Sequence, residues 1–366
     1  MELKELHLRG FRNYDSLDFT AAPGVNLIVG DNAQGKTNLL EAIVYLGSGK
    51  SFRTQKTSEL VKFGADFGEI SGKINAQERD QTLRAVIFPA ARPRQLFRNG
   101  AKKKSAAELA GVLHTVLFCP EDLLVLKAGA GERRRLGDAA MCQLRPNYDA
   151  ALCEYMRLLE QKNRILQDRF DNPALLEILP EFNLRLCQVG ALLISYRARF
   201  YSSLGQLASV YHGQFTGGNE EFQLYYHTVS TVKDPMASVE ILTENLREHM
   251  ESHAEAELAS CRCLTGPHRD DFDIRLDGLS VKNFGSQGQT RTAAISLKLA
   301  QRQLMGRELG EEPVLLLDDV LSELDSGRQD FVLNQITSGQ VFITCCEPGR
   351  FTKLGQTVEI RRGALA

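Results

Sequence analysis

The amino-acid sequence predicts an α/β fold that carries a phosphate-binding loop and is interrupted by an inserted α-helical domain. The first observation is a glycine-bounded loop at residues 30–37, which directly follows the apolar run Val25–Val29. The second is a middle third in which apolar residues recur at helical spacing, and the third is the return of short apolar strands after it. Both ends of the chain are therefore expected to build one domain of mixed sheets around a loop-to-helix unit.

The first third of the chain is predicted to form strands around that loop. Strand-like runs occur at residues 5–12, 16–19, 25–29, 70–74, 83–88 and 95–97. A helix is expected to start at Lys36, because residues 37–46 contain strong helix formers and no breaker. Asn99-Gly100 predicts a tight hairpin turn, since both residues tolerate a positive φ. A substantial antiparallel part is therefore expected beside the loop.

Helical spacing dominates the middle of the chain. Long helices are predicted at residues 148–168, 184–211 and 239–258. After them, strands are predicted at 271–276, 314–317 and 341–344, with a helix over 289–304. We therefore predict a discontinuous domain formed by 1–122 and 262–366, and a mainly helical inserted arm formed by 123–261.

Composition sets only broad limits on function. The chain of 366 residues has 44 Lys and Arg against 46 Asp and Glu, so nucleic-acid binding would depend on local basic patches. No secretory pattern or membrane-length apolar run occurs, so we expect a cytoplasmic protein without a membrane partner. The eight cysteines include no usual zinc spacing, since the close pairs are Cys261-x-Cys263 and Cys345-Cys346, and buried reduced thiols are expected.

The loop at 30–37 matches the phosphate-loop pattern G-x-x-x-x-G-K-[ST] at every fixed position. Backbone N–H groups and the positive end of a helix dipole suit phosphates, which predicts an ATP or GTP site. Lys36 is expected to reach the β- and γ-phosphates, and Thr37 to coordinate Mg²⁺. The expected nucleotide-binding residues of this loop are Gly30, Asp31, Asn32, Ala33, Gln34, Gly35, Lys36 and Thr37.

Two further segments belong to the same prediction. Asp318 ends the apolar strand 314–317, where a carboxylate can be held beside Mg²⁺ with Thr37, directly or through water. Asp319 is expected to be the second catalytic acid and to polarise the attacking water. A third segment opens the helix predicted after residue 285, and its expected nucleotide-contacting residues are Ser286, Gln287, Gly288 and Gln289. Its small residues allow a second molecule to approach a γ-phosphate closely.

The order of these segments resembles an ABC/SMC-like P-loop ATPase head. In such heads the serine-glycine segment of one copy closes over the nucleotide of another, so the resemblance implies a homodimer that forms on ATP. Most ABC-type heads have a glutamate where this chain has Asp319, and the shorter carboxylate predicts slow turnover. Many of them also place a histidine where Cys345-Cys346 follow Thr344, and the sequence has no convincing glutamine loop.

Several segments are more specific than the general ABC pattern. They are Leu8-Arg9-Gly10-Phe11-Arg12-Asn13-Tyr14, Gly30 to Thr37, Pro120-Glu121-Asp122-Leu123, Arg133-Arg134-Arg135, Gly266-Pro267-His268-Arg269-Asp270-Asp271, Ser286-Gln287-Gly288-Gln289 and Leu315-Leu316-Leu317-Asp318-Asp319. Over nearly its whole length the chain resembles the RecF family, relatives of the SMC and double-strand-break-repair ATPase heads. The resemblance implies a weak ATPase of DNA repair and replication that acts as an ATP-gated switch. It also implies ATP and Mg²⁺ as cofactors, and a role in marking gapped DNA or single-strand/double-strand junctions for RecA loading and the SOS response, with RecO and RecR as partners.

The candidate DNA contacts are basic residues outside the phosphate loop. They are Arg53, Arg92, Arg94, Arg98, Lys102, Lys103, Lys104, Arg133, Arg134 and Arg135. Such cations would neutralise phosphates without reading bases. His268-Arg269 fits a functional pair and a structural loop pair equally well.

Two alternative functions differ in class. An ATPase subunit of a membrane transporter would have a shorter interval between the phosphate loop and Ser286, a glutamine loop and a switch histidine. An SMC-like structural clamp would need hundreds of heptad residues in the middle of the chain. Neither pattern is present in this sequence.

Overall fold

The structure is a computed structural model that describes residues 1–89, 92–109, 111–336, 338–347 and 349–366. The chain forms two compact units, one from Met1–Leu123 with Lys298–Ala366 and the other from Leu124–Leu297. Helix α8 (Gln287–Leu309) runs across the boundary between them. The predicted division places 262–297 with the ATPase head, whereas the packing places this segment in the second unit. The reason is that β10 (Asp271–Leu276) pairs along its whole length with β9 (Phe222–His227).

The first unit contains an antiparallel sheet of six strands in the order β2-β1-β4-β5-β6-β7. Its strands are β1 (Glu2–Phe11), β2 (Tyr14–Thr20), β4 (Gly68–Ala76), β5 (Arg79–Ile87), β6 (Gln95–Arg98) and β7 (Ala101–Lys103). Burial alternates along β4, because one face of this sheet packs on the core. The predicted hairpin turn is confirmed, since Asn99 and Gly100 have φ values of 51° and 77° between β6 and β7.

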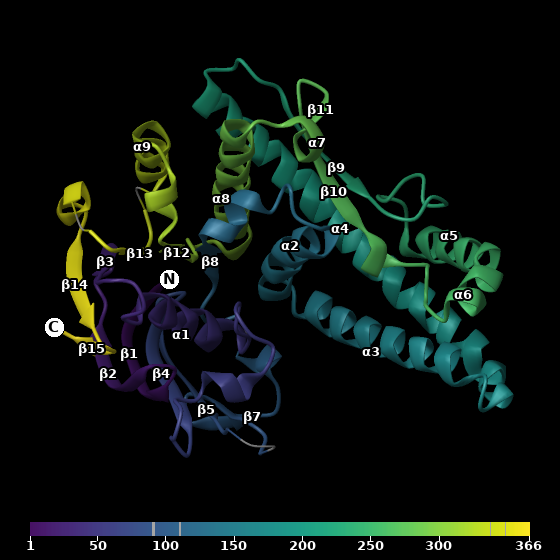
Figure 1. Ribbon diagram of the computed structural model, residues 1–366, viewed down its shortest axis with the longest axis horizontal. Helices are drawn as coiled ribbons and strands as arrows, with labels where there is room; N and C mark the ends of the chain where they lie inside the picture. The colour runs from purple at the N-terminus through teal and green to yellow at the C-terminus, as the bar shows by residue number, and fades with distance from the viewer. Residues whose placement is uncertain (90–91, 110, 337, 348) are drawn as a thin grey trace. The chain divides into compact units, whose positions relative to one another are not determined.

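The second sheet of this unit is mainly parallel and has the order β15-β14-β3-β13-β12-β8 (Figure 1). Its strands are β3 (Val25–Val29), β8 (Thr115–Phe118), β12 (Val314–Asp318), β13 (Val341–Cys345), β14 (Gln356–Arg361) and β15 (Ala364–Leu365). Every residue of β12 and β13 is buried, as is typical of parallel strands covered on both faces. Parallel pairing aligns the carboxyl ends of β3, β13 and β12 at one edge.

Helix α1 (Lys36–Ser48) contacts strands of both sheets. It starts at Lys36, which confirms the predicted start. Leu39, Leu40 and Ile43 are fully buried in the core that the two sheets share. The helix ends where Gly49 adopts a left-handed conformation and its N–H bonds to the Tyr45 carbonyl at 2.7 Å. Helix α9 (Ser326–Gln335) also belongs to this unit.

The second unit is mainly helical. Its helices are α2 (Ala130–Leu144), α3 (Pro146–Asp168), α4 (Leu179–Thr216), α5 (Val239–Ser252), α6 (Ala254–Ser260), α7 (Val281–Phe284) and the start of α8. The predicted helix at 239–258 is divided at His253 into α5 and α6. A three-stranded sheet of β11 (Leu279–Ser280), β10 and β9 accompanies the helices, and β9 is a strand that the sequence analysis missed. Short 3₁₀ turns connect many of the elements of both units.

Two further properties bear on the sequence predictions. No helix in the described part of the chain is long and apolar enough to cross a membrane. The eight cysteines are free thiols, and Cys187, Cys263 and Cys345 are buried as predicted. The prediction of burial is wrong for Cys153 and Cys346, which are exposed.

Candidate functional site

The phosphate loop connects β3 to α1 and needs glycine at two positions. A Cβ atom on Gly30 would lie 2.4 Å from the carbonyl oxygen of Ile360. Gly35 has a φ of 121°, and a Cβ there would lie 2.7 Å from the Asn13 side chain. The Gly35 carbonyl accepts a hydrogen bond of 2.9 Å from the Tyr14 hydroxyl. The loop is therefore held tightly from outside, and its glycines are required by close backbone approach.

The Lys36 side chain is folded back over this loop. Its ammonium donates to the carbonyl oxygens of Gly30 at 2.7 Å and Asp31 at 3.2 Å. The Asp319 carboxylate lies 3.8 Å away, and the Cys346 sulfur 3.4 Å away. Lys36 is 4% exposed, so the chain holds a nearly buried cation at the mouth of the loop. A group of this kind suits phosphate oxygens.

Thr37 and Asp318 meet at the carboxyl edge of the parallel sheet. The Thr37 hydroxyl donates to Asp318 Oδ1 at 3.0 Å, across 281 positions of sequence. The Thr344 hydroxyl donates to the same oxygen at 2.9 Å. Burial raises the pKa of the Asp318 carboxyl, although both hydroxyl bonds oppose that shift. A hydroxyl oxygen and a carboxylate oxygen that lie side by side are hard oxygen ligands, the kind that Mg²⁺ prefers.

Asp319 follows directly and turns the chain. It has a φ of 50°, in the left-handed region, and its N–H donates to the Thr344 hydroxyl at 2.8 Å. Thr344 therefore bonds to both acidic residues, since its hydroxyl also donates to Asp318, the residue opposite it in the parallel pair of β12 and β13. The predicted residues of the loop and of the acidic strand are thus brought together at one edge of the sheet.

Two cysteines stand where many ABC heads have a histidine. Burial raises the pKa of the Cys345 thiol to about 11, whereas Cys346 is exposed. The Cys346 thiol donates to Asn32 Oδ1 at 3.1 Å and accepts from the Lys36 ammonium. The Cys346 sulfur therefore lies beside the phosphate loop, at the place where many ABC heads have a histidine.

Sequence reasoning missed a partly buried polar cluster where α1 meets the turn between β1 and β2. The fully buried Glu41 carboxylate accepts two bonds from the Arg12 guanidinium, at 2.8 and 2.7 Å. Asn13 donates to the Gln34 carbonyl at 2.8 Å and accepts from Asn38 at the same distance. The sequence signal for this cluster was the segment Leu8 to Tyr14, which indicated only the family resemblance. From the turn between β1 and β2, Asn13 holds the phosphate loop through Gln34, and Arg12 holds α1 through Glu41.

The predicted signature residues lie in the second unit and begin α8. Ser286 is exposed, and its backbone N–H donates to Gln289 Oε1 at 3.0 Å. In return the Gln289 N–H donates to the Ser286 hydroxyl at 3.2 Å. This reciprocal pair is a capping box, which fixes the first turn of the helix.

The candidate DNA contacts differ widely in accessibility. Arg133 is 1% exposed, bonds to both oxygens of Asp271 at 2.6 and 2.7 Å, and also donates to backbone carbonyls. The prediction of Arg133 as a DNA contact is therefore wrong, because its donors are turned into the protein. Arg134 donates to the Asp270 carbonyl at 2.6 Å, and Arg135 pairs with Glu132 at 2.8 Å.

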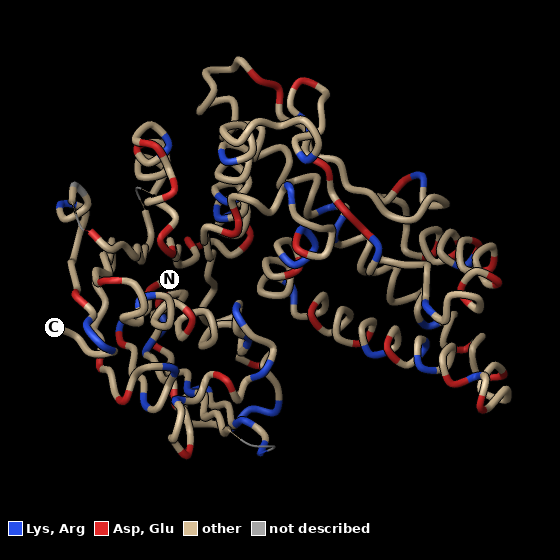
Figure 2. Tube along the Cα trace, viewed as in Figure 1, with Lys and Arg blue, Asp and Glu red and all other residues tan. Residues whose placement is uncertain are grey.

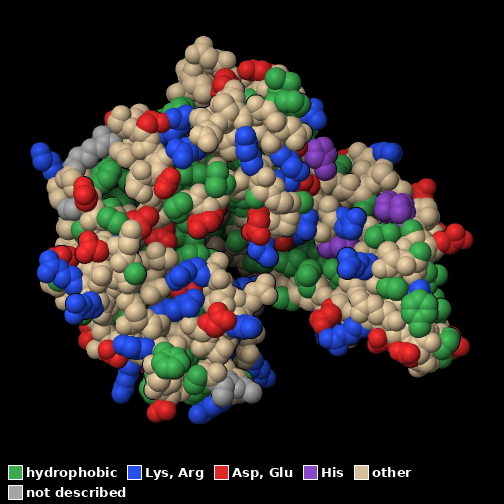
Figure 3. All heavy atoms as spheres, viewed as in Figure 1, with side chains coloured by type: hydrophobic (Ala, Val, Ile, Leu, Met, Phe, Trp, Pro, Cys, Tyr) green, Lys and Arg blue, Asp and Glu red, His purple; other side chains and the backbone are tan. Residues whose placement is uncertain are grey.

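The basic residues of the first unit also differ in how far their side chains are already bonded within the protein. Arg53 is half-exposed and bonds to Asn38 at 2.7 Å on α1, and Arg94 bonds to the Tyr45 hydroxyl at 3.0 Å. Arg92 lies over the Phe88 ring, and Arg98 donates to Gln81. Lys102, Lys103 and Lys104 form no ion pair with any residue that the structure describes, and basic residues gather on their hairpin (Figure 2). On the face drawn in Figure 3, acidic and basic side chains are interspersed.

His268 has a structural role, which decides the question that the sequence left open. Its Nδ1 lies 2.7 Å from the Tyr155 hydroxyl and its Nε2 lies 3.1 Å from the Cys263 carbonyl. Burial lowers the pKa of His268 to about 4. The ring is therefore neutral at pH 7, with Nε2–H as donor and Nδ1 as acceptor. Arg269 beside it is exposed.

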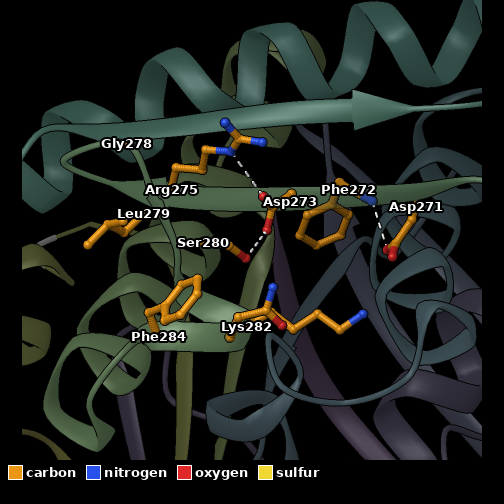
Figure 4. Close-up of a pocket in the computed structure, with 10 residues that line it drawn as sticks. Asp271, Phe272, Asp273, Arg275, Gly278, Leu279, Ser280, Lys282 and Phe284 are labelled. Carbon is orange, nitrogen blue, oxygen red and sulfur yellow. Dashed lines mark hydrogen bonds and ion pairs between the residues drawn. The ribbon is translucent and has the colours of Figure 1, made fainter.

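A pocket of about 430 Å³ lies against β10, β11 and α7 in the second unit (Figure 4). Asp273 accepts bonds there from Ser280 at 2.6 Å and Arg275 at 3.2 Å. Leu279 and Phe284 border it and are largely exposed. Its lining includes none of the predicted nucleotide-binding residues.

Comparison with known proteins places this geometry in context. Residues 2–364 match the family model described as RecF/RecN/SMC N terminal domain. A protein of Agathobacter rectalis described as "DNA replication and repair protein RecF" is 37% identical over 361 residues, covering 96% of this chain and 94% of the relative. A protein of Acetivibrio thermocellus with the same description is 36% identical over 352 residues, covering 96% and 95%.

Solved structures agree with the sequence relatives. The structure of "the recombination mediator protein RecF-ATP in RecFOR pathway" has a TM-score of 0.91 at 33% identity, covering 100% of this chain and 96% of the other. The corresponding RecF-ATPrS structure has a TM-score of 0.92 at 33% identity, covering 100% and 97%. A Pyrococcus furiosus Smc head domain, with a TM-score of 0.56 at 16% identity and coverage of 99% and 94%, shares the fold. The predicted fold class, an SMC-like P-loop ATPase head, is confirmed.

Proposed function

Because this chain belongs to the RecF family of DNA replication and repair proteins, we propose that it binds ATP with Mg²⁺ at loop 30–37 and uses the nucleotide to control dimerisation on DNA. The observation that carries the proposal is the bond of 3.0 Å between Thr37 Oγ1 and Asp318 Oδ1. These two oxygens come from distant segments and supply the metal-binding edge beside Lys36. The similar structure described as RecF-ATP supports ATP over GTP.

Each residue of the site has a separable role in this proposal. Lys36 exchanges its bonds to the Gly30 and Asp31 carbonyls for bonds to the β- and γ-phosphates. Thr37 and Asp318 would hold Mg²⁺, and the ion would supply positive charge to the phosphates. Asp319 orients the attacking water, and its left-handed backbone points the short carboxylate toward the Lys36 side of the loop. Hydrolysis is slow, so the protein works as a switch.

A second copy of the chain completes the site. Ser286 is exposed at the start of a helix of 23 residues, and Gly288 follows within the first turn. The Ser286 hydroxyl accepts a bond from the Gln289 N–H, which leaves its own hydrogen free to donate. It would donate to the γ-phosphate held by the other copy. ATP then favours the closed dimer more than ADP does, and this difference in affinity drives the switch.

DNA is the proposed partner of the closed dimer. The relatives described as DNA replication and repair proteins, and the solved relative placed in the RecFOR pathway, support this partner. We propose recognition of gapped DNA or single-strand/double-strand junctions, recruitment of RecO and RecR, RecA loading and the SOS response, in the cytoplasm. Lys102, Lys103 and Lys104 are the proposed phosphate contacts, with Arg134 and Arg135 as weaker candidates.

The test is sedimentation of the protein with a fluorescent gapped duplex, in ATP under non-hydrolysing conditions and in ADP. The wild type is expected to sediment as a dimer with DNA in ATP alone. Lys36→Met should abolish nucleotide binding, because the apolar chain fills the same buried space without a charge. Ser286→Arg should keep nucleotide binding and lose the dimer. A Ser286→Arg variant that still dimerises with ATP would refute the composite site.

The two other function classes find no support in the relatives. A transporter subunit would need the switch histidine, whose place is taken by Cys345 and Cys346. An SMC-like structural clamp would need a long coiled coil, whereas α3 and α4 have 23 and 38 residues. The resemblance to Smc heads is therefore limited to the fold.

A further inference from the structure

A chain of hydrogen bonds leads from the signature segment into the interior of the second unit. Gln289 Nε2 donates to Glu220 Oε1 at 2.8 Å. The other oxygen of Glu220 lies 2.9 Å from Nε2 of His212, whose side chain is fully buried in α4. Glu220 and His212 belong to no predicted motif, yet they stand directly behind the residues proposed to meet the nucleotide.

The orientation of the Gln289 amide follows from this chain. Because its Nε2 faces the Glu220 carboxylate, its Oε1 faces the Ser286 N–H at 3.0 Å. The reverse orientation would set the amide NH₂ against the Ser286 N–H, which is also a donor. Glu220 and the Ser286 N–H therefore favour the same orientation of the amide, Glu220 holds its NH₂ end, and the amide completes the capping box that holds Ser286.

The Glu220 carboxylate is in turn held by local structure. Helix α4 ends with left-handed Gly217 and Gly218, where the Gly218 N–H bonds to the Gly213 carbonyl at 2.8 Å. This turn brings residue 220 back beside residue 212. The next residue, Glu221, is fixed by the bond of 2.9 Å from its N–H to Asp277.

His212 is poised to donate to that carboxylate in its neutral form. Its Nδ1 is buried and has no hydrogen-bond partner among the described residues, so a proton on that atom would be unsatisfied. Burial lowers the pKa of His212, in agreement with a neutral ring. The neutral tautomer with hydrogen on Nε2 donates to Glu220 and leaves Nδ1 as a bare acceptor.

We propose that Glu220, supported by His212, is a positioning residue for the signature segment, which orients Ser286 toward the nucleotide of a second copy. This inference rests on the proposed function and deepens it, because it names what holds the trans-acting half of the composite site. Glu220 acts through Gln289 and does not touch the nucleotide.

Removal of the carboxylate tests the inference. In Glu220→Ala, nucleotide binding to the monomer should stay within about twofold, because the phosphate loop is intact. Loss of a charge-assisted bond should weaken each signature contact about 10-fold, and a symmetric dimer has two of them, so its dissociation constant in ATP should rise about 100-fold. Glu221→Ala is the matched control, since that exposed side chain bonds only to Gln223 within the described network. Glu220→Gln should weaken the dimer less than Glu220→Ala, because its amide oxygen can still accept from Gln289 while its NH₂ group faces the Nε2–H of His212.

Mixing of two variants separates positioning from a general loss of structure. Glu220→Ala has an intact phosphate loop, and Lys36→Met has an intact signature segment. A mixture of the two should dimerise in ATP better than Lys36→Met alone, because one of the two composite sites is then complete. If the mixture shows no rescue, or if Glu220→Ala behaves like Glu221→Ala, the positioning role is wrong. A wild type that shows no ATP-dependent dimer would instead overturn the proposed function itself.

Discussion

Replacement of Asp318 by asparagine is expected to stabilise the nucleotide-free protein and to weaken its binding of Mg²⁺–ATP. Asp318 is 6% exposed and its pKa is raised by burial, so folding disfavours the charged carboxylate. An asparagine oxygen can still accept from Thr37 and Thr344, which donate at 3.0 and 2.9 Å. The substitution therefore removes a poorly solvated charge and keeps both hydrogen bonds.

The expected changes in stability without nucleotide and in nucleotide affinity have opposite signs. Removal of the poorly solvated charge should raise the free energy of unfolding by about 0.5–2 kcal/mol. Loss of the anionic metal partner should weaken Mg²⁺-dependent nucleotide affinity about 10- to 100-fold. At a ligand concentration of 100 times the wild-type Kd, ligand binding stabilises wild type by about 2.7 kcal/mol, and a 100-fold weaker variant by only about 0.4 kcal/mol.

Thermal unfolding measured in EDTA and then with Mg²⁺–ATP checks both signs. Asp318→Asn should unfold at a higher temperature than wild type in EDTA, and it should gain less stability from Mg²⁺–ATP than wild type does. Asp325→Asn is the matched control, because Asp325 is an exposed helix cap that accepts from the Arg328 N–H at 3.0 Å; asparagine caps equally well and loses only a surface ion pair with the Arg328 side chain. An Asp318→Asn protein that is less stable in EDTA, or that gains as much from Mg²⁺–ATP as wild type, would refute the reasoning.

The same experiment has a pH dependence with a defined sign. A raised pKa means that the folded protein binds the Asp318 proton more tightly than the unfolded chain does. The free energy of unfolding of wild type should therefore increase as pH falls through that pKa, and the advantage of Asp318→Asn in EDTA should shrink. An advantage that grows with acidity would contradict burial as the cause of the shift.

Three further predictions concern the second unit and the basic residues. His268 has its pKa lowered from 6.5 to about 4, so the free energy of unfolding should fall by up to about 3 kcal/mol between pH 6.5 and 4; denaturant titrations should show a weaker fall for His268→Gln. Arg133→Met should destabilise the protein by about 3–5 kcal/mol, because it leaves Asp271 unpaired. Replacement of Lys102, Lys103 and Lys104 by alanine should leave stability unchanged and reduce the salt slope of DNA binding by up to about 3. An Arg133 variant that lost DNA affinity at unchanged stability would restore it as a DNA contact.

The phosphate loop could be read from the sequence because its chemistry is local. Glycine spacing, a lysine and a threonine within eight positions already specify a loop that opens a helix, and α1 starts at the predicted Lys36. The family was equally readable, since its segments are contiguous and lie along most of the chain. Long apolar periodicity also predicted α3 and α4, which bury one face against neighbouring helices.

Burial and long-range contact were decided by the tertiary structure. A run of three arginines looks uniformly basic, yet Arg133 is turned inward onto Asp271 while Arg135 faces solvent. The bond between Thr37 and Asp318 depends on the order of the parallel strands β3, β13 and β12, which aligns their carboxyl ends. The Glu220 link to Gln289 likewise joins residues 69 positions apart. Sequence periodicity reports which face of an element is apolar, whereas the partner of a polar side chain depends on how distant elements pack.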